Sequence, residues 1–160
     1  HPVQWRNHIL RGLGGGQFDI DNPILLPIIP DWGKITDFDI YDIDRDGSVE
    51  IIITRTTGRD GIDTSMPLDN IYYDGYMVQI LKGNDNSWSE WKRLEQPETM
   101  TTLHHPWFKS IVYDVNGDCI LDIVPENDKL NAQSFTSFNA IRGLYYEQQQ
   151  NGEFEIKYKQ

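Results

Sequence analysis

The chain has 160 residues, of which 38% are hydrophobic and 12% aromatic, enough for one ordinary globular domain or for part of a larger one. Its 25 acidic residues outnumber the 14 Lys and Arg residues, so the formal net charge is −11 at pH 7. Nucleic acids and anionic membranes attract clustered basic residues, and no basic run is present, so we expect neither partner. The longest apolar stretch, residues 24–30, is too short to insert into a membrane.

Residues 1–31 form a separate N-terminal segment that precedes a regular pattern. Its glycine run at 14–16 lacks the Lys-Ser/Thr that follows a phosphate-binding loop, so we expect a turn or linker there. The short apolar stretches around this turn can supply the outer strands of a preceding sheet.

Residues 32–106 contain the first repeat unit. The stretch YDIDRDGSVEIII at 41–53 places an acidic loop directly before an apolar run, and its β-branched residues favour a strand over a helix. A strand-like segment follows at 75–83, then a polar turn at 84–88 and a further strand. The predicted order is strand, acidic loop, strand, long loop, strand, tight turn, strand.

The same order of elements recurs in residues 107–160. YDVNGDCILDIV at 113–124 repeats the acidic loop and its strand, and residues 142–149 correspond to 75–83. FEIKYKQ at 154–160 alternates apolar and polar residues, which is the period of a half-buried strand. Two such units predict an all-β fold of two four-stranded antiparallel sheets, the blades of a β-propeller.

Two blades cannot close a ring, because a propeller needs about four to eight of them. We therefore expect a part of a larger or incomplete propeller, self-association, or two sheets packed as a small sandwich. In the first two cases the remaining blades or a second copy are partners.

Each acidic loop carries oxygen ligands at alternate positions, so that every second residue can turn toward a cation. Calcium accepts six to eight hard oxygens, whereas magnesium demands strict octahedral geometry. Ile53 and Pro125 stand where an EF-hand has its bidentate Glu, and this excludes an EF-hand. An ordinary acidic turn is the alternative for each loop. The predicted Ca²⁺ ligands are Asp42, Asp44, Asp46, the Ser48 carbonyl and Glu50 in the first loop, and Asp114, Asn116, Asp118, the Ile120 carbonyl and Asp122 in the second.

The doubled pattern Asp-x-Asp-x-Asp-Gly-x-x-Glu-Ile-Ile-Ile and Asp-x-Asn-Gly-Asp-x-x-x-Asp-Ile-Val resembles the FG-GAP/VCBS repeat family. The resemblance covers most of residues 32–160 and implies calcium-binding blades of an integrin-α-like β-propeller. Two positions depart from the family pattern. Glu50 stands in place of Asp, with an arm long enough to reach the ion. Cys119 stands in place of Gly, where a positive φ would strain it by about 1–3 kcal/mol.

These features predict a non-catalytic, calcium-stabilised repeat domain of a secreted, periplasmic or cell-surface protein. Its expected role is binding or adhesion, with a glycan or an extracellular protein as ligand. The alternative is an accessory propeller region of a polysaccharide-processing enzyme, such as a lyase or a glycoside hydrolase. The long loop at 55–75 is the predicted recognition surface. Trp32, Trp88, Trp91 and Trp107 are expected to pack between blades, with stacking on sugars as the alternative.

Overall fold

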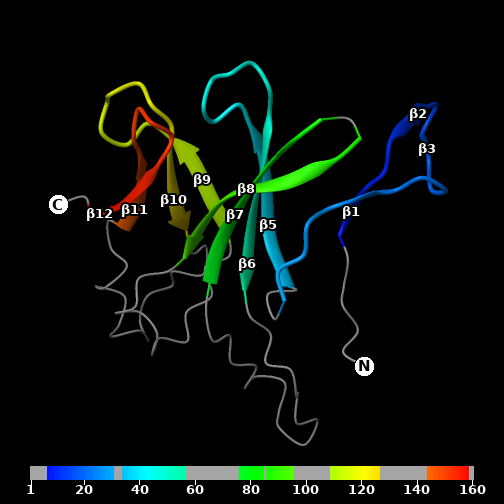
Figure 1. Cartoon of the computed structure of the whole chain (residues 1–160), viewed down its shortest axis with the longest axis horizontal. Coiled ribbons are helices and arrows are strands. Elements are labelled where there is room, and N and C mark those ends of the chain that lie inside the picture. Colours follow the sequence, from blue (N-terminus) through cyan, green and yellow to red (C-terminus); the bar gives the residue numbers. More distant parts are fainter. Residues whose placement is uncertain are drawn as a thin grey trace, which may run out of the picture.

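The computed structural model describes residues 7–30, 34–56, 76–84, 86–95, 109–126 and 144–158. These residues form four antiparallel sheets and no helix (Figure 1), which confirms the all-β prediction. Accordingly, nothing in these ranges is a helix able to cross a membrane. The sheets do not close into a ring within the described part of the chain.

Each larger sheet contains four consecutive strands. The first sheet has the order β5-β6-β7-β8 and the second the order β12-β11-β10-β9. Two smaller sheets, β1-β4 and β2-β3, lie in the N-terminal segment. The strands are β1 (His8–Ile9), β2 (Gly12–Gly14), β3 (Gln17–Phe18), β4 (Ile24–Leu25), β5 (Lys34–Tyr41), β6 (Glu50–Thr56), β7 (Tyr76–Gly83), β8 (Trp88–Glu95), β9 (Lys109–Tyr113), β10 (Asp122–Glu126), β11 (Leu144–Gln148) and β12 (Phe154–Tyr158).

The predicted recognition loop begins later than expected. Arg55 and Thr56 continue β6 and pair with β7, so they belong to the sheet. The rest of that loop, residues 57–75, lies outside the described residues.

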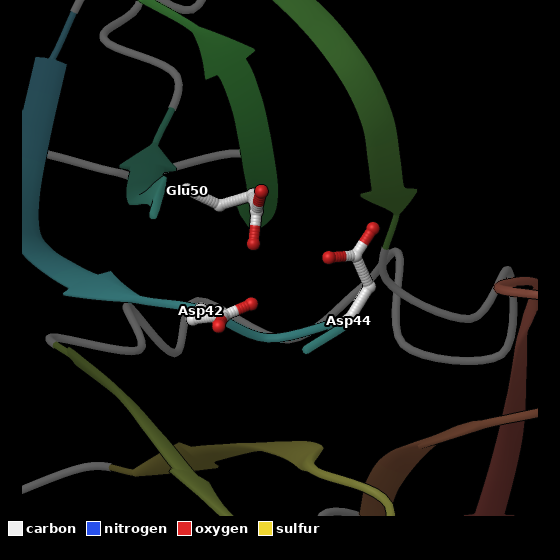
Figure 2. Close-up of side chains that lie close together, drawn as sticks. All are labelled: Asp42, Asp44 and Glu50. Carbon is white, nitrogen blue, oxygen red and sulfur yellow. The ribbon is translucent and has the colours of Figure 1, made fainter. Parts of the chain in front are cut away.

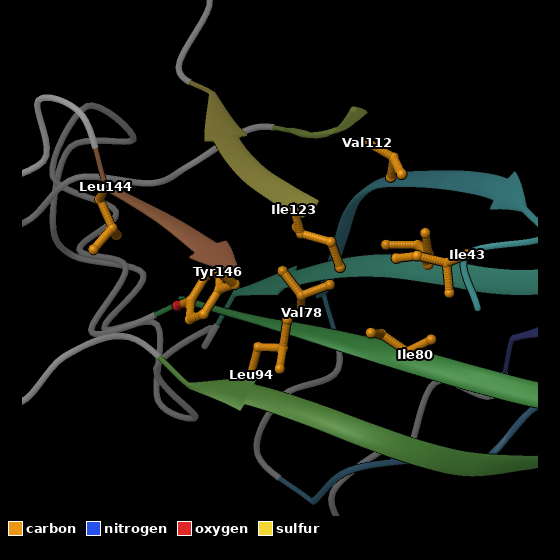
Figure 3. Packing of buried hydrophobic residues seen from close by; sticks show 9 residues of the cluster. Ile43, Val78, Ile80, Leu94, Val112, Ile123, Leu144 and Tyr146 are labelled. Carbon is orange, nitrogen blue, oxygen red and sulfur yellow. The ribbon is translucent and has the colours of Figure 1, made fainter. Parts of the chain in front are cut away.

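The two larger sheets pack face to face around one hydrophobic core (Figure 3). Burying one large aliphatic side chain contributes about 1.5–3 kcal/mol, so this core is the main force that holds the sheets together. Hydrogen bonds across the interface add to it: the Tyr146 hydroxyl donates to the Glu95 carbonyl at 2.9 Å, and Thr54 and Ser110 share a buried hydrogen bond of 2.9 Å. The core residues are Ile43, Ile52, Val78, Ile80, Leu94, Val112, Ile123, Leu144 and Tyr146.

The opposite face of the first sheet is covered in part by the N-terminal segment. Ile51, Ile53 and Leu81 form a second cluster there, against which Ile9 and Leu26 pack. The fully buried Arg55 fixes this contact. Its Nε donates to Gln79 Oε1 at 2.8 Å, and its Nη2 donates to the Pro27 carbonyl at 3.3 Å.

Both acidic loops lie at the same end of the molecule (Figure 1). The first connects β5 to β6 and the second connects β9 to β10. The buried side chain of Gln148 lies between them: with the amide oriented so that its nitrogen faces acceptors, it donates to the Leu121 carbonyl at 2.9 Å and to the Ile43 carbonyl at 3.1 Å. The repeated order of elements therefore places the two sets of predicted ligands next to each other.

Candidate metal centre in the acidic loops

The two loops share one backbone conformation, with glycines at different positions. In the first loop Arg45 has a φ of 59° and Gly47 a φ of 89°. At the equivalent positions of the second loop, Gly117 has 84° and Cys119 has 68°. The positive φ expected at the glycine position therefore occurs at Cys119. Its counterpart at Arg45 was missed, although aligning Arg45 with Gly117 in the repeat would have revealed it.

The side-chain oxygens of each loop, which are carboxylates except for the Asn116 amide, first serve to fold it. Their oxygens accept backbone N–H groups, and equivalent residues do so in both loops, which is the local reason that both stretches adopt the same turn. The matched pairs are Gly47 N to Asp42 Oδ2 (3.1 Å) with Cys119 N to Asp114 Oδ2 (2.9 Å), Asp46 N to Asp44 Oδ1 (3.2 Å) with Asp118 N to Asn116 Oδ1 (2.9 Å), and Ser48 N to Asp46 Oδ1 (2.8 Å) with Ile120 N to Asp118 Oδ1 (2.8 Å).

The last acid of each loop is fully buried. Glu50 Oε2 accepts the Ile43 N–H at 2.9 Å, and Asp122 Oδ2 accepts the Val115 N–H at 2.9 Å. The longer side chain of Glu50 thus makes the same bond as Asp122. Asp122 Oδ1 also accepts the Gln148 N–H at 3.0 Å, whereas Glu50 Oε1 accepts no hydrogen bond. Burial raises the pKa of both carboxyl groups.

Three side chains of the first loop converge on one point. One oxygen each from Asp42, Asp44 and Glu50 lies within 4.8 Å of the others, and Figure 2 shows the three carboxylates turned toward a shared space. Among the residues that the structure describes, the buried side-chain atoms without a hydrogen-bond partner are Asp42 Oδ1 and Glu50 Oε1. Two buried oxygens that accept no hydrogen bond, beside a third carboxylate, fit a hard divalent cation, because buried polar atoms are costly to leave without a hydrogen bond or a metal ion.

Lys82, from the end of β7, reaches into this loop. Its Nζ hydrogen-bonds Asp44 Oδ2, lies 3.0 Å from Asp46 Oδ2 and lies 3.6 Å from Glu50 Oε1. The hydrogen bond from Lys82 lowers the pKa of Asp46. Partial burial disfavours the charged Lys82, but the hydrogen bonds to its carboxylate partners outweigh burial and hold its pKa well above the usual value. No pattern in the sequence predicts that Lys82 contacts this loop.

The second loop has different charges around the same backbone. Asn116 replaces Asp44, and its amide donates to Asp118 Oδ2 at 3.0 Å and to Glu147 Oε1 at 2.8 Å. The hydrogen bond from Asn116 lowers the pKa of Glu147. Backbone hydrogen bonds to Asp114 outweigh its burial and lower its pKa. Sequence reasoning also missed Glu147, which lies on β11.

The remaining predicted ligands are less well tied to the centre of each loop. Asp46 pairs with Lys82 and is not one of the three converging side chains, Asp42, Asp44 and Glu50. Ser48 and Ile120 each donate a backbone N–H to an aspartate of their own loop. Metal binding by their carbonyl oxygens stays a prediction.

A second feature lies apart from both loops. An open groove of about 530 Å³ runs between the N-terminal segment and the β7–β8 turn. It is lined by the half-buried Trp88 and by Arg11, Asn84 and Asn86, with Ile9, Gly12 and Ile24 completing the wall. The indole of Trp88 packs on the second cluster, which confirms a packing role, and the same residue lines the groove.

Comparisons with known proteins add no family to these observations. No family model matches the chain, and neither a curated protein nor a solved structure is significantly similar to it. The likeness of the two loops to FG-GAP/VCBS repeats therefore stays a prediction from the sequence motif.

Proposed function

We propose that the chain is a calcium-stabilised, non-catalytic binding module of a secreted, periplasmic or cell-surface protein. In this proposal its two sheets are blades of a larger or incomplete propeller of the FG-GAP/VCBS type. The observation that carries the proposal is the pair of buried oxygens, Asp42 Oδ1 and Glu50 Oε1, which accept no hydrogen bond and belong to two side chains that converge with Asp44. Calcium bound there would be structural, pinning the turn between β5 and β6.

The charge of the first loop favours a divalent ion. Asp42, Asp44, Asp46 and Glu50 lie within nine consecutive residues and bring four carboxylates to one turn. Two unit charges about 4 Å apart repel by roughly 1 kcal/mol in water and by about 4 kcal/mol at the lower effective dielectric near a protein surface. A single ammonium offsets only part of this repulsion. Calcium suits the loop better than magnesium because it tolerates irregular sets of carboxylate and carbonyl oxygens.

Thermal unfolding in calcium and in chelator tests the structural role of the ion. Extracellular sites have dissociation constants of about 10⁻⁴–10⁻³ M, so about 10 mM calcium stabilises each occupied site by about 1.4–2.7 kcal/mol. This corresponds to a rise in Tm of about 3–10 °C. Identical melting curves in calcium and chelator would remove the basis of the proposal.

A variant separates the loop from general charge effects. Asp44→Asn keeps the Oδ1 that accepts the Asp46 N–H but removes one negative ligand, so the calcium-dependent rise in Tm should shrink. Asp21→Asn is the matched control, because it removes the same charge from an exposed position outside the loops. Equal responses of the two variants would point to an ordinary acidic turn.

We further propose that the ligand of the module is a glycan bound in the groove at Trp88. A half-buried indole beside two side-chain amides and a guanidinium combines an apolar stacking face with donors and acceptors for hydroxyl groups. A glycan array identifies the ligand class, and titration of the best glycan against Arg11→Ala and Asn86→Ala tests the groove. If neither substitution weakens binding, the glycan occupies another surface.

A further inference from the structure

The repeat places side chains of opposite charge at one equivalent position beside the two loops. Ile51 and Ile123 each follow the last acid of their loop, and they pair with Leu81 on β7 and Tyr146 on β11. The next residues along these strands, Lys82 and Glu147, are therefore equivalent. Each contacts the equivalent ligand of its own loop: Lys82 bonds Asp44, and Glu147 accepts a hydrogen bond from Asn116.

Lys82 lies where a metal ion would have to share its partners. Its ammonium pairs with Asp44, Asp46 and Glu50. Of these, Asp44 and Glu50 are also predicted to bind the ion together with Asp42. Its Nζ also lies 4.4 Å from the centre of the Trp91 ring, a cation–π contact that holds the side chain over the loop. The ammonium is therefore held on several sides, yet it leaves Asp42 Oδ1 and Glu50 Oε1 without a hydrogen bond.

We propose that Lys82 is a built-in cation of the first loop, which offsets part of the negative charge of the carboxylate cluster when calcium is absent and is displaced when calcium binds. This inference rests on the proposed calcium site. The first loop then keeps its fold without metal and binds calcium more weakly than its four acids alone would. The second loop has Glu147 at that position, which adds a carboxylate instead of an ammonium and pairs with Lys157 at 3.7 Å.

Calcium titration calorimetry on variants of the full chain tests the inference. All variants carry Asp118→Asn, which removes a carboxylate from the second loop while keeping the oxygen that accepts the Ile120 N–H. In this background Lys82→Gln should bind calcium about tenfold more tightly, because the ion no longer has to displace an ammonium from Asp44 and Glu50. Lys82→Arg, which keeps the charge, should bind like the parent.

Thermal unfolding in chelator supplies a second readout. Lys82→Gln should lower Tm in chelator, because the cluster loses its counter-charge, and calcium should restore Tm to at least that of the parent. Lys82→Met, which keeps the apolar stem, should behave in the same way if the glutamine variant folds poorly. Lys92→Gln is the matched control: Lys92 also lies near Trp91, at 5.7 Å, but pairs with Glu153 instead of the loop, so calcium affinity should not change.

The outcomes separate this inference from the proposed function. If the parent binds calcium and Lys82→Gln binds it no more tightly, the proposed displacement of Lys82 by calcium is wrong while the calcium site stands. If neither protein binds calcium and chelator changes no melting curve, both proposals are wrong. Tighter calcium binding by Lys82→Gln, together with an unchanged calcium affinity of Lys92→Gln, supports the displacement of Lys82 by calcium.

Discussion

Replacing Cys119 by glycine should stabilise the protein, because the second loop holds a non-glycine residue in the left-handed region. Cys119 has a φ of 68° and an exposed side chain, so its thiol contributes little packing. Its backbone N–H donates to Asp114 Oδ2 at 2.9 Å, a bond that glycine also makes. The substitution therefore changes the backbone strain and leaves this hydrogen bond in place.

Two opposing effects set the change in the free energy of unfolding. A left-handed conformation costs an ordinary L-residue roughly 1–2 kcal/mol, and glycine avoids this cost. Glycine also has more freedom in the unfolded chain, which offsets about 0.5–1 kcal/mol of the gain. Cys119→Gly should therefore raise the free energy of unfolding by about 0.5–1 kcal/mol, or Tm by about 1–4 °C.

The assay is urea unfolding of the variant in chelator and again in calcium, with Gly47→Ala as the reverse control. A Cβ on Gly47 would meet no atom within 4 Å, so the alanine is strained only by the φ of 89°. It should lower the free energy of unfolding by a similar amount. If Cys119→Gly is neutral or destabilising while Gly47→Ala is destabilising, backbone strain at Cys119 is not the cause.

Three other substitutions test the fold that carries the loops. Gly83→Ala would place its Cβ 2.3 Å from the Ser87 carbonyl oxygen, so it should lower the free energy of unfolding by more than about 2 kcal/mol in urea unfolding. Tyr146→Phe removes the hydrogen bond to the Glu95 carbonyl and should cost about 1 kcal/mol in the same assay, with native circular dichroism retained. Gln79→Ala leaves the buried Arg55 without one acceptor and should cost about 2–3 kcal/mol; a loss below 0.5 kcal/mol would show that water replaces the amide.

The sequence predicted the parts of the fold that depend on local pattern. Isoleucine runs and alternation located the strands, and the repeat predicted two four-stranded sheets with matching loops. The conformation at Cys119 was also foreseeable, since the equivalent Gly47 indicates a left-handed turn. These features are encoded within a few residues of where they act.

The partners that come from distant strands could not be predicted in the same way. Lys82 and Glu147 reach the loops only because of the strand register, and register is set by the packing of the whole sheet. The packing of the N-terminal segment on the first sheet likewise depends on Arg55, a charged residue that its sequence position would assign to a surface loop.

Ile43 gives the acidic loops an influence beyond their own turns. It lies between two of the predicted ligands, its N–H donates to Glu50, and its side chain is buried in the core between the sheets. Its carbonyl shares the Gln148 amide with Leu121, which flanks the second loop. The buried Gln148 amide and the Ile43 side chain therefore tie the backbones of both loops to each other and to the core between the sheets. A substitution at either residue should disturb both loops together, although neither residue is itself a predicted ligand.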